Sequence, residues 1–135
     1  MTFTRLLSTA GVAVFLCLAG LGESQASDLK VTEMAVTTKI VKGSPIDSVR
    51  SISSSSVKAL YCFTRFQAPQ GTDTTIKHIW YRDDAVMHGD EMPVKGSRWR
   101  TYSQISVQKG HTGEWRCDVV DSEGTLLKSV SFRMN

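Results

Sequence analysis

Gly113-Glu114-Trp115-Arg116-Cys117 is the stretch of sequence that decides the fold. It places an aromatic side chain two positions before a cysteine. Two further residues of the same kinds, Cys62 and Trp80, lie on separate apolar segments earlier in the chain. Side chains two positions apart in a strand share a face, so Trp115 and Cys117 point the same way. The three segments therefore predict strands that surround one core of cysteine and tryptophan side chains.

Short apolar segments separated by turn residues follow one another along the chain, and no stretch has a helical period of useful length. The expected strands are 29–41, 57–66, 76–82, 85–94, 99–107, 115–120 and 126–134. The spacing of Cys62, Trp80 and Cys117 resembles the bridged core of an immunoglobulin-type sandwich. We therefore predict an all-β protein, an immunoglobulin-like antiparallel β-sandwich of about seven strands.

The first residues have the pattern of a secretory signal peptide. Arg5 precedes an uncharged run over 6–21, and Ser24-Gln25-Ala26 supplies small residues at a cleavage site. We predict that 1–26 is a signal peptide and that 27–135 forms a single β-sandwich domain. The expected location is periplasmic or secreted, with no stable membrane insertion after cleavage. Two alternatives stay open: a membrane anchor through an uncleaved 6–21 segment, and a lipid attached at Cys17.

Cleavage of the signal peptide removes Cys17 and leaves two cysteines, Cys62 and Cys117, in an oxidising compartment. They are predicted to form one disulfide bond. The chain-entropy model gives such a bond about 4 kcal/mol of stabilisation. Redox-active pairs usually lie close together as Cys-x-x-Cys, so the wide spacing favours a structural role.

Composition narrows the class of protein. The chain has 16 basic and 13 acidic residues, a formal net charge of +3, and the charges are spread evenly. It has no basic block and no zinc-finger or helix-turn-helix pattern, so we predict no nucleic-acid partner. Phosphate-binding glycine motifs are also absent from the sequence. A chain of this length has enough residues for one domain and too few for a second.

Four segments resemble domain-of-unknown-function family 2914 in their order and spacing. They are His78-Ile79-Trp80-Tyr81, Ser97-Arg98-Trp99-Arg100-Thr101-Tyr102-Ser103, Gly113-Glu114-Trp115-Arg116 and Asp121-Ser122-Glu123-Gly124. The resemblance covers roughly the whole of the predicted domain. It implies a bacterial protein that is exported or attached to membrane-embedded segments. The family has no assigned activity, so the resemblance brings no catalytic residues with it.

A group of arginine and tyrosine side chains is the candidate surface for a ligand or partner. It consists of Arg98, Arg100, Tyr102 and Tyr81. The first three lie two positions apart and share a strand face, with Trp99 on the other face. Two guanidinium groups beside a phenol can clamp a carboxylate or phosphate, or stack on a sugar or peptide. The alternative is a structural ladder in which these arginines pair with acids such as Asp118 or Glu114 on neighbouring strands.

Tryptophan and histidine side chains are the expected structural core: Trp80, His78, Trp99 and Trp115. His78 lies two positions before Trp80, so it points inward and needs a hydrogen-bond partner there. The catalytic alternative pairs His78 with a carboxylate such as Asp118. No Gly-x-Ser-x-Gly elbow or recognisable triad supports it, and we expect no catalytic residues.

Two groups of residues could bind metal ions. Met87, His88 and Met92 are soft ligands of the kind that copper prefers. Four acids flank the same hairpin and suggest calcium: Asp83, Asp84, Asp90 and Glu91. Neither spacing matches a strong metal motif, and packing of an edge strand and turn chemistry account for both. We therefore predict no metal and no cofactor.

The function that these observations favour is an exported, non-catalytic binding or interaction module of the bacterial cell envelope. Its expected partner is an envelope protein or an anionic glycan. Two alternatives stay open: a small envelope hydrolase that uses His78, and a purely structural accessory domain of a membrane assembly. Fold alone does not choose among them.

Overall fold

The computed structural model describes residues 28–135, so the predicted signal peptide, 1–26, lies outside the described residues. This part of the chain forms ten strands: β1 (Lys30–Thr37), β2 (Ile40–Val41), β3 (Ser44–Pro45), β4 (Ser51–Ile52), β5 (Ala59–Gln67), β6 (Asp73–Arg82), β7 (Ala85–Lys95), β8 (Arg98–Ser106), β9 (Gly113–Asp121) and β10 (Leu126–Met134). No helix capable of crossing a membrane is found among the described residues.

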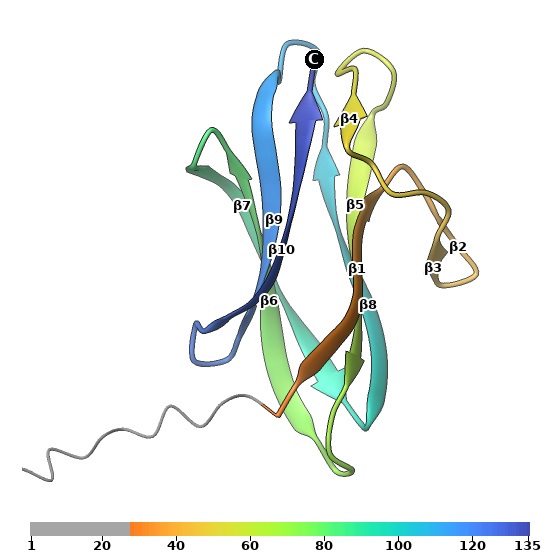
Figure 1. Ribbon diagram of the computed structural model, residues 1–135, viewed down its shortest axis with the longest axis vertical. Coiled ribbons are helices and arrows are strands. Elements are labelled where there is room, and N and C mark those ends of the chain that lie inside the picture. Colours follow the sequence, from red (N-terminus) through yellow and green to blue (C-terminus); the bar gives the residue numbers. More distant parts are fainter. Residues whose placement is uncertain (1–27) are drawn as a thin grey trace, which may run out of the picture.

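Two sheets face each other and enclose the core (Figure 1). The first has the order β1-β5-β8, and all its strands are antiparallel. The second has the order β4-β10-β9-β6-β7, with only the short β4 parallel to its neighbour. The hairpin of β2 and β3 lies beside the first sheet, outside the sandwich.

The connectivity of the long strands is that of an immunoglobulin-like sandwich. The first, second and fifth long strands (β1, β5 and β8) form one sheet, while the third, sixth and seventh (β6, β9 and β10) form the core of the other. These are the positions of strands A, B, E and C, F, G in the immunoglobulin fold. The fourth long strand, β7, joins the second sheet as strand C′ does in variable-type domains. The prediction of an all-β, immunoglobulin-like sandwich is therefore confirmed.

The strand count is higher than the predicted seven, because the connection over 38–58 contains three additional two-residue strands. The expected first strand, 29–41, ends early at Thr37. The carboxylate of Asp47 accepts hydrogen bonds from the Thr37 hydroxyl at 2.6 Å and the Thr38 amide at 2.8 Å. Lys42 and Gly43 then turn the chain with φ of 52° and 74°. A side-chain contact ten residues away in sequence thus breaks a strand that local alternation predicts as continuous.

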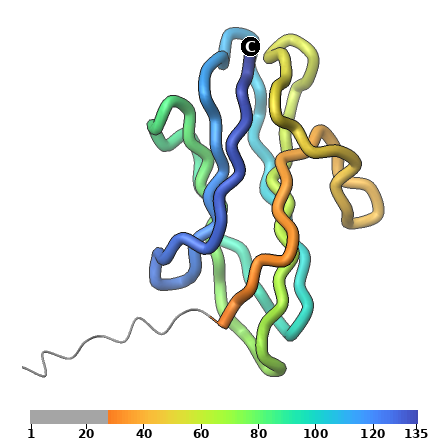
Figure 2. The backbone as a smooth tube through the Cα atoms, in the orientation of Figure 1, coloured from red at the N-terminus to blue at the C-terminus, as the bar shows by residue number. Residues whose placement is uncertain are grey.

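The serine-rich segment after residue 50 contacts the C-terminal end of the chain. β4 pairs with the last residues of β10, Ser51 opposite Arg133 and Ile52 opposite Met134. The Ser54 amide donates to the Asn135 carbonyl at 2.8 Å. Figure 2 shows this part of the tube beside the blue C-terminal end.

Aromatic side chains form the centre of the core. Trp80 meets Phe132 edge-on with ring centroids 6.3 Å apart, and Trp115 stacks on Phe132 at 6.1 Å. A second apolar cluster lies toward the other end of the sandwich, around Phe66 and Ile76. Trp99 is half-buried against that second cluster.

The predicted disulfide bond is wrong. Cys62 on β5 and Cys117 on β9 are free thiols whose sulfur atoms lie 3.0 Å apart, whereas a covalent bond would bring them to about 2.05 Å. The frame of cysteines correctly predicts that the two side chains face each other across the core. Cysteine counting cannot distinguish contact from bonding, and here the inward side chain of His78 shares the space between the sheets.

Candidate functional site

A buried group of three metal-ligating side chains lies between the sheets; we call it the Cys–His cluster. It consists of Cys62 from β5, His78 from β6 and Cys117 from β9. One donor atom from each lies within 4.8 Å of the other two, and all three residues are 0% exposed. Alternation along each strand turns these side chains inward, because β6 also buries Trp80 and β9 also buries Trp115.

Two hydroxyl groups hold the imidazole of His78. Its Nε2 is 2.5 Å from the Thr64 hydroxyl, and its Nδ1 is 2.8 Å from the Ser103 hydroxyl. The Ser103 oxygen also accepts a hydrogen bond from the indole N–H of Trp80 at 3.1 Å. Every side-chain nitrogen of His78 and Trp80 therefore has a partner supplied by the facing sheet.

The two thiols of the cluster differ in acidity. Burial disfavours the Cys62 thiolate, but hydrogen bonds from Cys117 and His78 outweigh it and lower the pKa of Cys62 to about 6. Burial, together with the hydrogen bond to Cys62, raises the pKa of Cys117 well above its ordinary value. The two thiols therefore titrate as a coupled pair in which Cys62 is the more acidic member.

The structure does not bring His78 and Asp118 together as the hydrolase alternative requires. His78 points into the core, whereas Asp118 lies on β9 one position from the inward Cys117 and contacts outward side chains. Both nitrogens of His78 are bonded to hydroxyls, and the ring has no exposed surface. The acid–base pair of the hydrolase alternative therefore does not form, because His78 and Asp118 point to opposite faces of the sheet.

A second candidate site lies on the outer side of the first sheet; we call it the arginine face. Arg98 and Arg100 project from β8 beside Arg65 of the neighbouring β5. With Thr32 and Gln67 they line a groove of about 370 Å³. These residues come from β1, β5 and β8, so the antiparallel register of the sheet assembles the groove.

The charges of the arginine face are poorly balanced. Arg65 stands directly opposite Arg100 in the ladder between β5 and β8. The Nε of Arg65 lies 3.3 Å from the carboxylate of Glu33 without a hydrogen bond, and the Arg100 guanidinium donates to the Ser44 hydroxyl at 3.4 Å. Within residues 28–135 no acid pairs with Arg98 or Arg100. Like charges placed opposite each other destabilise a sheet.

The candidate surface residues divide between the two outer faces of the sandwich. Tyr102, which is 50% exposed, lies two positions from Arg100 and meets Tyr61 edge-on at 6.0 Å. Tyr81 lies on the outer face of the second sheet, where the Arg116 guanidinium stacks on its ring at 4.0 Å. The structure therefore groups Tyr102 with the arginines and places Tyr81 elsewhere.

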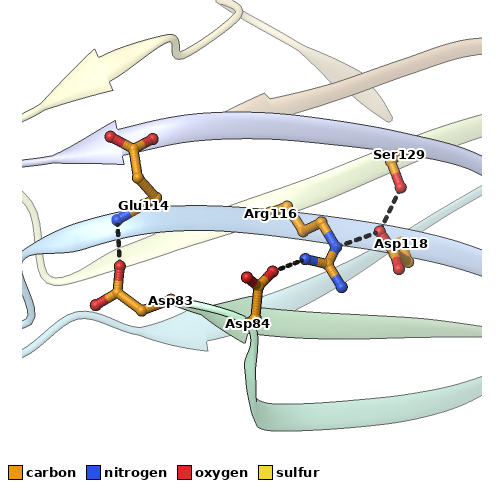
Figure 3. Close-up of polar contacts among 6 residues, drawn as sticks. All are labelled: Asp83, Asp84, Glu114, Arg116, Asp118 and Ser129. Atoms are coloured by element: carbon orange, nitrogen blue, oxygen red, sulfur yellow. Dashed lines mark hydrogen bonds and ion pairs between the residues drawn. The ribbon is translucent and has the colours of Figure 1, made fainter.

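The acids named in the structural alternative are engaged by other arginines. Figure 3 shows Arg116 between Asp84, at 2.6 Å, and Asp118, at 3.1 Å. Asp118 also accepts from the Ser129 hydroxyl. The hydrogen bond to Asp84 is the main cause that raises the pKa of Arg116. Glu114 pairs with Arg133, so neither Asp118 nor Glu114 forms a ladder with the arginine face.

Strand β9 also holds the hairpin turn between β6 and β7 in place. Asp83 accepts a hydrogen bond from the Glu114 amide at 2.9 Å (Figure 3). Asp83 and Asp84 have φ of 47° and 65°, the left-handed backbone that tight hairpins need. Their acidic side chains thus connect a turn to β9, which is turn chemistry of the kind the sequence predicts.

Of the three soft side chains considered for copper, Met92 lies apart from Met87 and His88. Met87 and His88 line a groove of about 290 Å³ with His111. His88 pairs with Asp90 at 3.0 Å. The sulfur of Met92 accepts a hydrogen bond from Thr101, and its side chain packs against the second core cluster. Among the His, Cys, Asp and Glu side chains of residues 28–135, the Cys–His cluster is the group of three whose donor atoms lie close enough to hold a metal ion.

Sequence reasoning missed both the Cys–His cluster and the contribution of Arg65. A usable signal for the cluster existed, because His78, Trp80 and Cys62 were all assigned to inward positions of neighbouring strands. Finding Arg65 requires the register of β5 against β8. Alternation within one strand does not reveal how that strand aligns with a partner strand elsewhere in the chain.

Comparison with known families confirms the resemblance found in the sequence. The family described as "Protein of unknown function (DUF2914)" matches residues 73–134. The matched region starts with β6 and ends with β10. It includes Arg98, Arg100, His78 and Cys117 and leaves out β1 to β5, so it is shorter than the predicted whole-domain resemblance. No curated protein sequence matches the chain.

Solved structures show similarity at the level of the fold, with 88 matching chains. One is an immunoglobulin-like protein from Pseudomonas aeruginosa, with 15% identity over 81% of this chain and 98% of that one, and a TM-score of 0.49. Another is the alkylpurine DNA glycosylase AlkC from Pseudomonas fluorescens, bound to DNA containing an abasic site analogue. It has 10% identity over 82% of this chain and a TM-score of 0.52, and the match spans 31% of the glycosylase chain.

Proposed function

We propose that this chain, whose residues 73–134 match the DUF2914 family, is a non-catalytic binding module of the bacterial cell envelope that recognises anionic groups through its arginine face. The observation that carries the proposal is the placement of Arg65, Arg98 and Arg100 around one groove of about 370 Å³. Guanidinium groups bind carboxylates and phosphates through charge-assisted hydrogen bonds, often two at a time.

The charge arrangement favours a ligand over a purely structural role. Arg65 faces Arg100 across the ladder, and mutual repulsion there costs folding stability instead of adding to it. Glu33 offers one negative charge to three positive ones. An anion bound in the groove would neutralise the excess positive charge. A binding role therefore accounts for arginines that lower the stability of the sheet.

Aromatic side chains beside the arginines favour an acidic glycan as the ligand. Tyr102 is half exposed beside Arg100, with Tyr61 as its neighbour. Exposed tyrosine rings give flat apolar area at a low cost in conformational entropy, and sugar rings have matching apolar faces. Carboxylated sugars combine that apolar face with the anionic group that the arginines recognise.

Binding to a fluorescent oligogalacturonate, a chain of carboxylated sugars, tests the proposal. We expect saturable binding that weakens as salt is added. The double variant Arg98→Ala with Arg100→Ala should lose affinity by roughly tenfold or more, since each charge-assisted hydrogen bond contributes about 1.5–3 kcal/mol. Its stability should stay the same or rise, because the repulsion with Arg65 is relieved.

The matched control is Lys77→Ala with Lys128→Ala, which removes the same charge from exposed positions of the second sheet. If both double variants weaken binding equally, only net charge matters and the assigned face is wrong. Tighter binding of poly-L-glutamate would favour an acidic protein as partner. Binding of a neutral maltooligosaccharide with equal affinity would contradict anion recognition.

The envelope location rests on the pattern of residues 1–26. Fractionation of expressing cells, followed by mass determination of the purified chain, tests it. We expect the protein in the periplasm or medium and lacking the first 26 residues. An intact chain in the membrane fraction would favour an anchor through 6–21 instead.

A further inference from the structure

We propose that Cys62, His78 and Cys117 bind one thiophilic d10 cation, Zn²⁺ or Cu⁺, between the two sheets. The cluster unites residues from β5 in one sheet and from β6 and β9 in the other. A cation bound there would link the two layers of the sandwich, as structural zinc ions do in small domains. The proposed site is separate from the arginine face, so it stands or falls independently of the proposed function.

The positions of the donor atoms suit a single ion. Sulfur ligands lie about 2.3 Å and imidazole nitrogens about 2.0–2.1 Å from zinc, so two sulfurs at a tetrahedral angle are roughly 3.8 Å apart. The cluster holds its three donors within 4.8 Å of one another, with the sulfurs 3.0 Å apart. Opening the sulfur pair by less than 1 Å therefore reaches coordination distance, a change that small rotations of the cysteine side chains supply.

The neighbours of His78 fit a metal ligand. An imidazole that binds a metal through one nitrogen usually donates the other N–H to a nearby oxygen. Thr64 and Ser103 place a hydroxyl at each ring nitrogen. The ring nitrogen that coordinates the ion gives up its hydroxyl partner, whereas the opposite nitrogen keeps its own and holds the orientation of the ring.

The burial of the cluster narrows the choice of ion. The donors are two sulfurs and one imidazole nitrogen, which excludes hard cations because these prefer oxygen ligands. All three ligands are fully buried, which also disfavours cations that retain bound water. Two thiolates neutralise Zn²⁺, and burying a neutral complex avoids the cost of an unpaired charge. Three donors are one short of a closed zinc site. Cu⁺ accepts three soft ligands without a fourth.

Metal titration of the reduced full chain, with Cys17→Ser as background, is the decisive experiment. Under anaerobic conditions we expect one Co²⁺ or Zn²⁺ per chain, with a sulfur-to-cobalt charge-transfer band for Co²⁺. A parallel titration against bicinchoninate measures Cu⁺. The Zn²⁺ titration is likewise run against a zinc chelator. The site is assigned to zinc if the chain takes Zn²⁺ from its chelator more readily than it takes Cu⁺ from bicinchoninate, and to copper in the reverse case.

Variants and a protection assay make the result specific. Cys62→Ser with Cys117→Ser should abolish binding, while His78→Gln should weaken it at least tenfold. Because core variants can fail to fold, alkylation of wild-type thiols is followed as well, and bound metal should slow it at least tenfold. A reduced wild-type chain that binds no more Zn²⁺ or Cu⁺ than the double cysteine variant overturns the proposal. Metal binding that leaves the alkylation rates of both thiols the same as in the metal-free chain also overturns the proposal.

Discussion

Removing the Ser103 hydroxyl should destabilise the domain more than any other single deletion of one oxygen atom from β8. Ser103 is 5% exposed, and its oxygen is bonded to the Trp80 indole at 3.1 Å and to His78 Nδ1 at 2.8 Å. In Ser103→Ala both of these buried atoms lose their partner. A buried polar group without a partner costs about 1–3 kcal/mol, so the loss of two such partners should lower the unfolding free energy by about 2–6 kcal/mol.

Urea denaturation followed by tryptophan fluorescence measures this loss, since Trp80 and Trp115 report directly on the core. The matched control is Ser106→Ala, an exposed position on the same strand, which should change stability by less than about 0.5 kcal/mol. Ser103→Thr keeps the hydroxyl and should recover part of the loss. A Ser103→Ala domain within about 1 kcal/mol of wild type would refute the reasoning, because the polar atoms of His78 and Trp80 would then not depend on Ser103.

Three further predictions concern stability. Phe132→Ala removes the ring between Trp80 and Trp115 and should lower the unfolding free energy by about 3–5 kcal/mol. The control Leu126→Ala, at an exposed position of the same strand, should lower it by less than about 1 kcal/mol. Equal losses for the two variants in urea denaturation would contradict the assigned core. Burial opposes ionisation of Asp47, but hydrogen bonds from Thr37 and Thr38 outweigh it and lower the pKa of Asp47 below 3.8. The contribution of the ionised carboxylate to folding stability is therefore fully present above pH 3.8 and is lost as the pH falls through the lowered pKa. Acid titration of stability should thus be less steep for Asp47→Asn than for wild type, and identical profiles would rule out this role. Lys42 has φ of 52° in the hairpin turn, so Lys42→Asn should stabilise by about 0.5–1 kcal/mol in thermal unfolding, and a loss of stability would contradict the turn geometry.

The sequence predicted the parts of the fold that depend on local alternation. Alternation places Leu60 and Cys62 on one face of β5 and Trp80 on the inward face of β6, and the structure buries all three. The structure also has a turn in the gap between the expected strands 115–120 and 126–134, where Gly124 takes a φ of 82° and Asp121 accepts hydrogen bonds from the amides of Glu123 and Thr125. These features need no knowledge of the partner strand.

Features that depend on long-range register were beyond the sequence. The break after Thr37 comes from Asp47, and the pairing of β4 comes from the C-terminal end of β10. The expected disulfide failed for a related reason. The pattern identified which strands face each other, but a covalent bond depends on sulfur positions set by the packing of both sheets.

The sequence alone could predict only in part which candidate surface residues lie on the same face of the domain. Arg98, Arg100 and Tyr102 were grouped correctly by their spacing of two within β8, since that is a property of one strand. Tyr81 was joined to them without a physical link, and β6 turns it to the opposite side of the sandwich beside Arg116. Residues from different strands can be grouped only when the order of strands in the sheets is known.

Chemical-shift mapping by NMR with an oligogalacturonate tests the central claim most directly, because it locates the bound ligand on the domain. The account predicts that shifts are largest for amides of β5 and β8 around Arg65, Arg98 and Arg100, and for the guanidinium groups themselves. Saturating shifts centred on the outer face of the second sheet, or no shifts at concentrations that saturate the binding assay, would contradict recognition of anions by the arginine face.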